Sequence, residues 1–168
     1  MISLLEKKLN QINLKKIDEN LPQAAVLILI VENDKDYSIV FTERSKRLPS
    51  HAGEVSFPGG KKENEDKNLI ETALRETHEE IGIKPSSIKV LGRMNSQESR
   101  FGLSVTPYIG YTTGNLEFIL EPKEVETIFT VPLEYLKKNP LISNKITNAS
   151  GETSVSYTHL RAHETSVN

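Results

Sequence analysis

Cysteine is absent from all 168 residues of the chain. Its absence excludes disulfide bonds, thiolate metal sites and cysteine nucleophiles, and it fits a reducing compartment. Long apolar runs are absent as well, because the longest, Ala24 to Val31, has only eight residues. That length is too short to span a bilayer and is typical of a buried strand. The sequence therefore predicts a cytoplasmic protein without a membrane partner.

A strong excess of one charge is also lacking, since the formal net charge is −2. No broad basic surface is implied, which argues against a nucleic-acid partner. The apolar fraction of 36% and the charged fraction of 26% are ordinary for a globular chain. A chain of this length is long enough for one compact domain with a buried core.

The first 20 residues are expected to form an amphipathic helix packed on the main domain, which we place at residues 21–150. Lysine and asparagine interrupt the apolar positions and no small-residue cleavage site follows, so this is not a secretory signal. Apolar residues recur at helical spacing at Ile2, Leu5, Leu9 and Ile12. A packed helix explains this pattern better than a membrane anchor.

The main domain alternates strand and helix patterns. Ala24 to Val31 and Tyr37 to Thr42 flank a turn at residues 33–36 and predict a hairpin. A long polar loop, Glu43 to Ser56, follows it, and long ordered loops are often functional. Further strands are expected at 88–92, 105–111 and 118–120, a turn or short strand at 124–129, and a short helix from Pro132 to Lys138. These elements predict an α+β domain with helices packed on a mixed sheet.

The clearest helix is predicted at Leu69 to Ile81. Asp66 is a candidate N-cap and Gly82 a candidate C-terminal glycine. Between them, apolar residues and threonine recur at helical spacing and predict a buried stripe. Glu71 and Arg75 stand four residues apart and could form an ion pair on the exposed side.

Three glutamates share one face of this helix: Glu76, Glu79 and Glu80. Like charges at this spacing repel one another unless a cation compensates, and carboxylates select hard cations such as Mg²⁺ or Mn²⁺. Magnesium held by few carboxylates usually also binds substrate phosphates, which points to phosphate ester or anhydride chemistry. For the glutamates alone, a solvated acidic face is the favoured interpretation. The preceding Gly59-Gly60 favours a site, because paired glycines let the backbone approach a ligand closely.

The segment FPGGKKENEDKNLIETALRETHEEIGI resembles the Nudix box, G-x5-E-x7-R-E-U-x-E-E-x-G-U, where U is aliphatic. The matching residues are Gly60, Arg75, Glu76, Glu79, Glu80, Gly82 and Ile83. The chain departs from the box at three points: Asp66 replaces the first glutamate, Arg75 falls one residue late, and Thr77 replaces an aliphatic residue.

The first two departures, and the string Thr72 to Glu76, resemble one Nudix subfamily, the coenzyme A pyrophosphatases. A second signature of that subfamily, L-L-T-x-R-S-x-x-L-R-x-H-x-G-x-V-x-F-P-G-G, is similar to residues 41–60. The shared residues are Thr42, Arg44, Ser45, Leu48, His51, Gly53, Val55 and Phe57 to Gly60. Pro49 departs from it, because an arginine is usual there.

The resemblance implies an α/β/α sandwich and attack of water on a diphosphate bridge, assisted by Mg²⁺ or Mn²⁺. For coenzyme A the implied products are 3′,5′-ADP and 4′-phosphopantetheine. The implied metal ligands are Glu76, Glu80, Glu79 and the carbonyl of Gly60. Glu79 or Glu80 is the implied catalytic carboxylate and Arg75 orients the glutamates. The implied substrate-binding residues are Arg44, Arg47, Gly59 and Gly60.

Other polar residues remain open at this stage. His51 is expected to order its loop by hydrogen bonding. Glu54 has both a catalytic and a structural interpretation. Glu98 and Glu124 lie in later loops, where Nudix enzymes often keep a general base, although a plain surface role is favoured for each residue alone.

Two alternatives to the coenzyme A prediction remain. One is hydrolysis of another diphosphate, such as ADP-ribose or a nucleoside triphosphate. The signature from Arg44 to Gly53 disfavours it, although the departure at Pro49 leaves room for it. The other is a non-catalytic binding module, which would be expected to lose the box glutamates that are all present here. The sequence gives no oligomeric state.

The tail, residues 151–168, has no core pattern. SYTHLRAHET resembles the translation of a sequencing adapter, so residues from about Val155 are expected to be non-native. An ordinary disordered tail is the alternative. Because relatives of this kind usually continue with a strand and a helix, we expect the domain to be truncated at its C-terminus.

Overall fold

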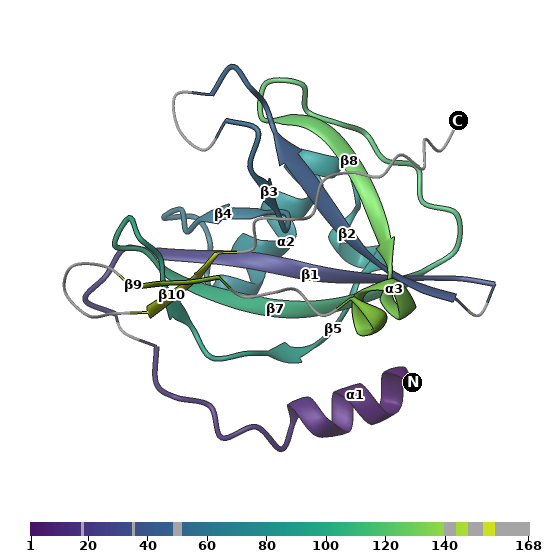
Figure 1. Ribbon diagram of the computed structural model, residues 1–168, viewed down its shortest axis with the longest axis horizontal. Helices are drawn as coiled ribbons and strands as arrows, with labels where there is room; N and C mark the ends of the chain where they lie inside the picture. Colours follow the sequence, from purple (N-terminus) through teal and green to yellow (C-terminus); the bar gives the residue numbers. More distant parts are fainter. Residues whose placement is uncertain (18, 35, 49–51, 140–143, 148–152, 157–168) are drawn as a thin grey trace.

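The computed structural model describes residues 1–17, 19–34, 36–48, 52–139, 144–147 and 153–156. Its core is an eight-stranded mixed sheet in which five strands follow the order β3-β2-β1-β7-β5, while β4 pairs with β1, β6 with β7 and β8 with β2 (Figure 1). The strands are β1 (Gln23–Asn33), β2 (Asp36–Arg44), β3 (Val55–Ser56), β4 (Gly59–Lys61), β5 (Lys89–Arg93), β6 (Gln97–Glu98), β7 (Ser104–Thr113) and β8 (Val125–Pro132). The helices are α1 (Ile2–Leu9), α2 (Leu69–Ile81), η1 (Pro85–Ser87) and α3 (Leu133–Lys138).

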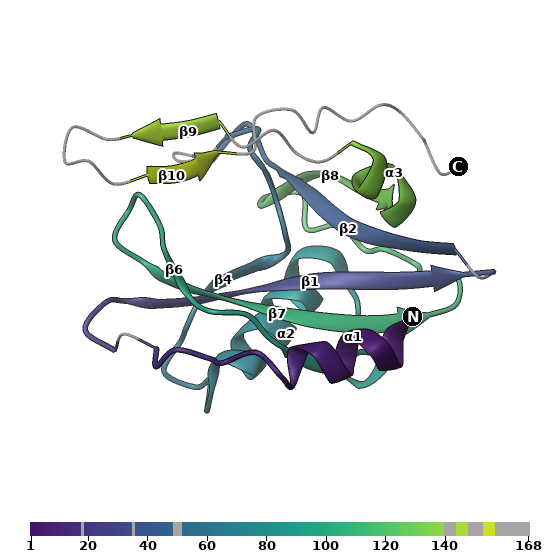
Figure 2. The same cartoon turned by 60° about the horizontal axis from the view of Figure 1, so that its bottom comes forward.

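Helices cover both faces of the sheet, so the predicted α/β/α sandwich is confirmed (Figure 2). Successive side chains of a strand point to opposite faces of the sheet, so the residues of β1 contribute to the cores on both faces. Leu27 and Leu29 are fully buried in the core that α2 shares. Ile30 instead joins Leu9 in a second cluster on the α1 side. Burying a leucine fully stabilises the fold by about 2 kcal/mol.

The predicted hairpin forms, but β2 accompanies β1 for only part of its length. The two strands pair from Ile30–Ile39 to Asn33–Asp36. Nearer its start, β1 pairs with β4 instead, with Ala25 opposite Gly60. The divergence of β2 therefore gives β4 a place beside β1, which brings Gly59-Gly60 into the sheet.

The N-terminal helix is shorter than predicted. It ends at Leu9, so Ile12 lies beyond it and is 38% exposed. Leu9 packs against β5 at Gly92, where a side chain would lie 3.1 Å from the Leu9 Cβ. Lys89 Nζ donates to Glu6 at 2.8 Å across the same contact. Among the described residues, no helix has the length and apolar character needed to cross a membrane.

The predictions after α2 are confirmed only in part. Strands β5 and β7 occur within a few residues of their predicted bounds, and α3 begins just after Pro132. Residues 124–129, predicted as a turn or short strand, belong largely to the eight-residue β8. The strand predicted at 118–120 is wrong, because the Ile119 N–H donates to the carbonyl of Ile81 at the end of α2.

The tail is described only in part. β9 (Asn144–Thr147) and β10 (Thr153–Ser156) form a separate two-stranded antiparallel sheet. Residues 157–168 lie outside the described residues. The expectation that the chain from about Val155 is non-native therefore stays a prediction.

Candidate active site

The helix α2 has the predicted bounds, Leu69 to Ile81. Gly82 ends it in the left-handed conformation, with φ of 78°, as its position predicted. The predicted N-cap is wrong, because Asn68 caps the helix through its Oδ1, which accepts from the Glu71 N–H at 2.9 Å. Asp66 therefore does not cap the helix and makes other contacts.

Asp66 is buried and binds Arg75 through two parallel bonds. The Arg75 Nε lies 3.0 Å from one carboxylate oxygen and Nη2 lies 2.9 Å from the other. The Thr72 hydroxyl and the Glu63 N–H also donate to Asp66, each at 2.9 Å. The hydrogen bonds from Arg75 hold the pKa of Asp66 well below its usual range. This bond network joins the loop after β4 to the middle of α2.

Arg75 also contacts two of the predicted site glutamates. Its Nη1 lies 2.9 Å from Glu76 and 3.0 Å from Glu79. This is the arrangement expected of an arginine that orients carboxylates. The predicted pair with Glu71 is wrong, because Glu71 accepts from the Lys67 N–H instead.

Three carboxylates converge beside α2: Glu76, Glu80 and Glu124 each offer an oxygen within 4.8 Å of the others. Glu80 is only 3% exposed. Burial, and to a smaller extent repulsion from Glu76 and Glu124, raises its pKa to about 7, although the hydrogen bond from Gly59 acts in the opposite direction. Burial also raises the pKa of Glu76. Glu79 lies outside this trio and its side chain is 54% exposed. The geometry thus unites two of the three predicted glutamates with a residue for which a surface role was favoured.

The Gly59-Gly60 pair fits closely over these carboxylates. The Gly59 N–H donates to Glu80 Oε2 at 3.1 Å. A Cβ on Gly60 would lie 2.4 Å from the carboxyl carbon of Glu76, so any side chain there would push this carboxylate out of its place. Three carboxylate ligands, of which Glu80 is buried, Glu76 partly buried and Glu124 exposed, form a donor set that suits a hard divalent cation. The residues present therefore fit Mg²⁺ or Mn²⁺.

We expect Gly60→Ala to lower activity by about 10- to 100-fold, because the added methyl group must displace Glu76 from the trio. Steady-state turnover and circular dichroism measure the loss and the retention of fold. Gly114→Ala is the control for backbone strain without a steric clash, because its φ is 92° while nothing lies within 4 Å of the added Cβ. A Gly60→Ala protein as active as wild type would contradict a role for this close contact.

Glu124 is held in place from both sides. The Ser45 N–H donates to its carbonyl at 2.9 Å, which ties it to the loop after β2. On the other side, the Glu121 N–H donates to the carbonyl of Glu80 at 3.1 Å. Residues 119–121 thus cap the end of α2 and lead directly to Glu124. No spacing in the sequence signals this arrangement.

The two predicted arginines of the loop lie in different surroundings. Arg44 Nη1 is 4.0 Å from Glu80 Oε1, and its buried Nε has no hydrogen-bond partner among the described residues. Arg47 is exposed. Pro49 and His51 lie outside the described residues. Glu98, in β6, is exposed and is not part of the trio.

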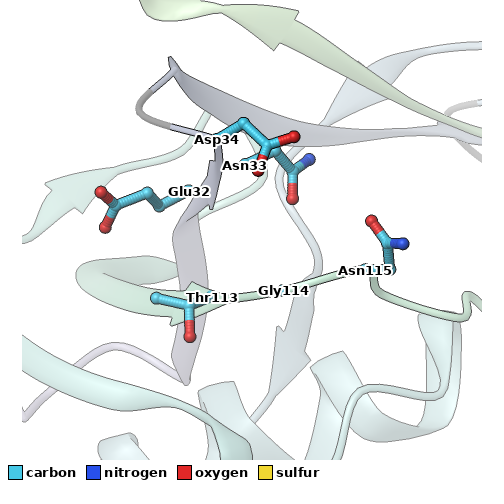
Figure 3. A pocket seen from close by; sticks show the side chains of 6 residues that line it. All are labelled: Glu32, Asn33, Asp34, Thr113, Gly114 and Asn115. Atoms are coloured by element: carbon cyan, nitrogen blue, oxygen red, sulfur yellow. The ribbon is translucent and has the colours of Figure 1, made fainter.

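A surface hollow of about 430 Å³ lies at the opposite end of β1 from Gly60 (Figure 3). It is lined by the β1–β2 turn and the end of β7, at Glu32, Asn33, Asp34, Thr113, Gly114 and Asn115. Its position separates it from the trio.

The chain belongs to the Nudix family, because a model of the Nudix domain matches residues 21–153. It is 44% identical over 114 residues to a protein of Yersinia enterocolitica named uncharacterized Nudix hydrolase NudL, covering 68% of this chain and 58% of the relative. It is 43% identical over 120 residues to Nudix hydrolase 15, mitochondrial, of Arabidopsis thaliana, covering 70% of this chain and 42% of the relative. The chain thus spans roughly half the length of these relatives.

Solved structures share the fold at lower sequence identity. The Nudix hydrolase RenU of M. smegmatis superposes with a TM-score of 0.60 at 17% identity, over 70% of this chain and 74% of that one. An Ap4A hydrolase of C. elegans superposes with a TM-score of 0.58 at 19% identity, over 68% and 83%. The Nudix domain of Shewanella oneidensis NrtR, solved with ADP ribose, gives 0.53 at 18%, over 70% and 77%.

Proposed function

We propose that the chain is a divalent-cation-dependent pyrophosphohydrolase that cleaves coenzyme A or its derivatives to 3′,5′-ADP and 4′-phosphopantetheine. The observation that carries the proposal is the convergence of Glu76, Glu80 and Glu124 under the Gly59-Gly60 backbone. Family membership makes a diphosphate the expected substrate, and the signature at residues 42–60 favours coenzyme A among diphosphates.

The metal ligands in this proposal are Glu76, Glu80 and Glu124, with Glu79 and the Gly60 carbonyl at the edge of the site. A bound Mg²⁺ or Mn²⁺ supplies positive charge that offsets the charge of the diphosphate oxygens. Arg44 adds a cation beside Glu80, and its side chain is 29% exposed, so its guanidinium can donate to a phosphate oxygen. Arg75 acts indirectly, because its donors are engaged by Asp66, Glu76 and Glu79.

The reaction consists of attack by water on one phosphorus of the diphosphate. The bond from that phosphorus to the bridging oxygen breaks, the bridging oxygen leaves with the other phosphate, and a carboxylate accepts a proton from the water. Glu79 is the candidate for this acceptor, because its side chain is 54% exposed at the edge of the site and it is not one of the three converging ligands.

Coenzyme A, ADP-ribose and dNTPs, each assayed with Mg²⁺ or Mn²⁺, test the substrate. We expect selective release of 3′,5′-ADP from coenzyme A and complete loss of turnover in EDTA, restored by either cation. Folded protein that prefers another diphosphate would retain the hydrolase proposal and reject coenzyme A. Folded protein that cleaves none of them would favour a binding module, and circular dichroism shows whether the protein is folded.

A further inference from the structure

An arginine-aromatic pair lies at the turn between β6 and β7, near the proposed site. The guanidinium carbon of Arg100 is 4.8 Å from the centre of the Phe101 ring. Both side chains are well exposed, Arg100 at 65% and Phe101 at 56%. A planar cation and an aromatic ring held together in this way offer donors for a phosphate and a surface for a flat base.

The turn lies at the same end of the sheet as the Gly59-Gly60 pair. Ser104, at the start of β7, pairs with Gln23, while Gly60 pairs with Ala25 two residues along β1. Figure 2 shows β6 and the start of β7 at the same end of the sheet as β4. The exposed pair is therefore close to the proposed substrate loop.

A chain of direct contacts connects Arg100 with the carboxylate trio. Arg100 Nη2 donates to Glu54 Oε1 at 2.6 Å. The carbonyl of Glu54 accepts from the Arg44 N–H at 2.9 Å, and Arg44 Nη1 lies 4.0 Å from Glu80. Arg100 is thus connected with Glu80 through two intervening residues, Glu54 and Arg44.

We propose that Arg100 is a specificity-determining residue that binds the 3′-phosphate of a 3′-phosphoadenosine diphosphate, with Phe101 contacting its adenosine. This inference rests on the proposed function and adds the part of the substrate that distinguishes coenzyme A from ADP-ribose.

The present ion pair of Arg100 with Glu54 does not prevent this role. The two side chains are 65% and 48% exposed, and exposed ion pairs of this kind contribute little to stability. A guanidinium has five N–H donors, so a phosphate can bind beside the carboxylate or replace it. Charge-assisted bonds from arginine to phosphate are strong and often bidentate.

The test compares the binding of 3′,5′-ADP and 5′-AMP in Mg²⁺, measured by titration calorimetry on the full chain. These ligands differ only in the 3′-phosphate. We expect wild type to bind 3′,5′-ADP about 10-fold more tightly or better, and Arg100→Ala to lose that preference while its affinity for 5′-AMP changes little. Arg100→Lys should retain part of the preference. Arg93→Ala is the matched control, because Arg93 donates to backbone carbonyls in a different part of the sheet.

Several outcomes would overturn the inference. These are a wild type without the preference, a preference that survives in Arg100→Ala, equal weakening of both ligands, and loss of the preference in Arg47→Ala instead. Glu54→Gln distinguishes phosphate binding by Arg100 from a purely structural role of the Arg100–Glu54 ion pair. A binding role predicts that this variant keeps the preference, whereas a purely structural ion pair predicts that it behaves like Arg100→Ala.

The inference and the proposed function can fail separately. Wild type that cleaves coenzyme A but binds both nucleotides equally contradicts the role of Arg100 alone. Wild type that prefers 3′,5′-ADP but cleaves no coenzyme A contradicts the proposed hydrolysis alone. Wild type that neither prefers 3′,5′-ADP nor cleaves coenzyme A would contradict both the role of Arg100 and the proposed hydrolysis.

Discussion

Glu80→Gln is expected to lower turnover by roughly 100- to 1,000-fold and yet to stabilise the cation-free protein above pH 7. The loss of turnover follows from removing a charged member of the trio. The gain in stability follows from burial, which raises the pKa of Glu80 to about 7 from the usual 4.5 of a glutamate. Above pH 7 the folded protein must hold a buried negative charge that glutamine lacks.

The sign of the pH dependence follows from the direction of that shift. Because the pKa of Glu80 is higher in the folded chain than in the unfolded one, its contribution to stability is fully present below about pH 4.5 and is lost as pH rises through about 7. At 1.36 kcal/mol per pKa unit, the difference is about 3 kcal/mol at most. Urea unfolding in EDTA at pH 5 and pH 8 measures it, with Glu80→Gln more stable at pH 8.

Glu79→Gln is the matched control for this stability effect. Glu79 is next to Glu80 in the chain and carries the same charge, but its side chain is 54% exposed. We expect the free energy of unfolding to change by about 0.5 kcal/mol or less at either pH. An equal gain at pH 8 in both variants would indicate general repulsion on the helix and contradict the special role of buried Glu80.

Asp66→Asn is expected to lower the free energy of unfolding by about 2 to 3 kcal/mol, because it leaves Arg75 without its bidentate partner. Turnover should fall as well, since Arg75 also holds Glu76 and Glu79. The pKa of Asp66 is depressed in the folded chain, so its contribution is present above the unfolded value of about 3.8 and is lost as pH falls below it. The gap between wild type and variant should therefore shrink in acid.

Unfolding by urea at pH 7 and pH 3 tests this expectation. Glu63→Gln is the control, because Glu63 reaches Arg75 only at 3.7 Å and its side chain is 59% exposed. A double-mutant cycle with Arg75→Lys isolates the pair, and additive effects would mean that Asp66 and Arg75 act independently.

The helix that carries the site was predictable because its signals are local. Its apolar stripe, its acidic face and Gly82 together predicted Leu69 to Ile81. The choice between Asp66 and Asn68 as the N-cap was not predictable, because both residue types cap helices well. Arg75, nine residues further along the chain, binds the Asp66 carboxylate, so Asn68 caps the helix.

Glu124 could not be placed by any spacing rule. It joins Glu76 and Glu80 only because residues 119–121 cross the end of α2 and donate to its last carbonyls. The same contacts explain why the strand predicted at 118–120 does not form. The backbone N–H groups of Ile119 and Glu121 donate to carbonyls at the end of α2 and not to a neighbouring strand.

The parallel pairing of β1 with β7 has a consequence for how the chain folds. It joins Gln23 with Ser104 and Glu32 with Thr113, so all of α2 lies within the loop that this pairing closes. Closing such a loop costs conformational entropy before the strands gain their hydrogen bonds, and non-local pairing of this kind slows folding. Glu124 lies outside the loop, beyond β7. Its meeting with Glu76 and Glu80 therefore adds a further non-local contact, which the chain must form in addition to the central pairing before the site is complete.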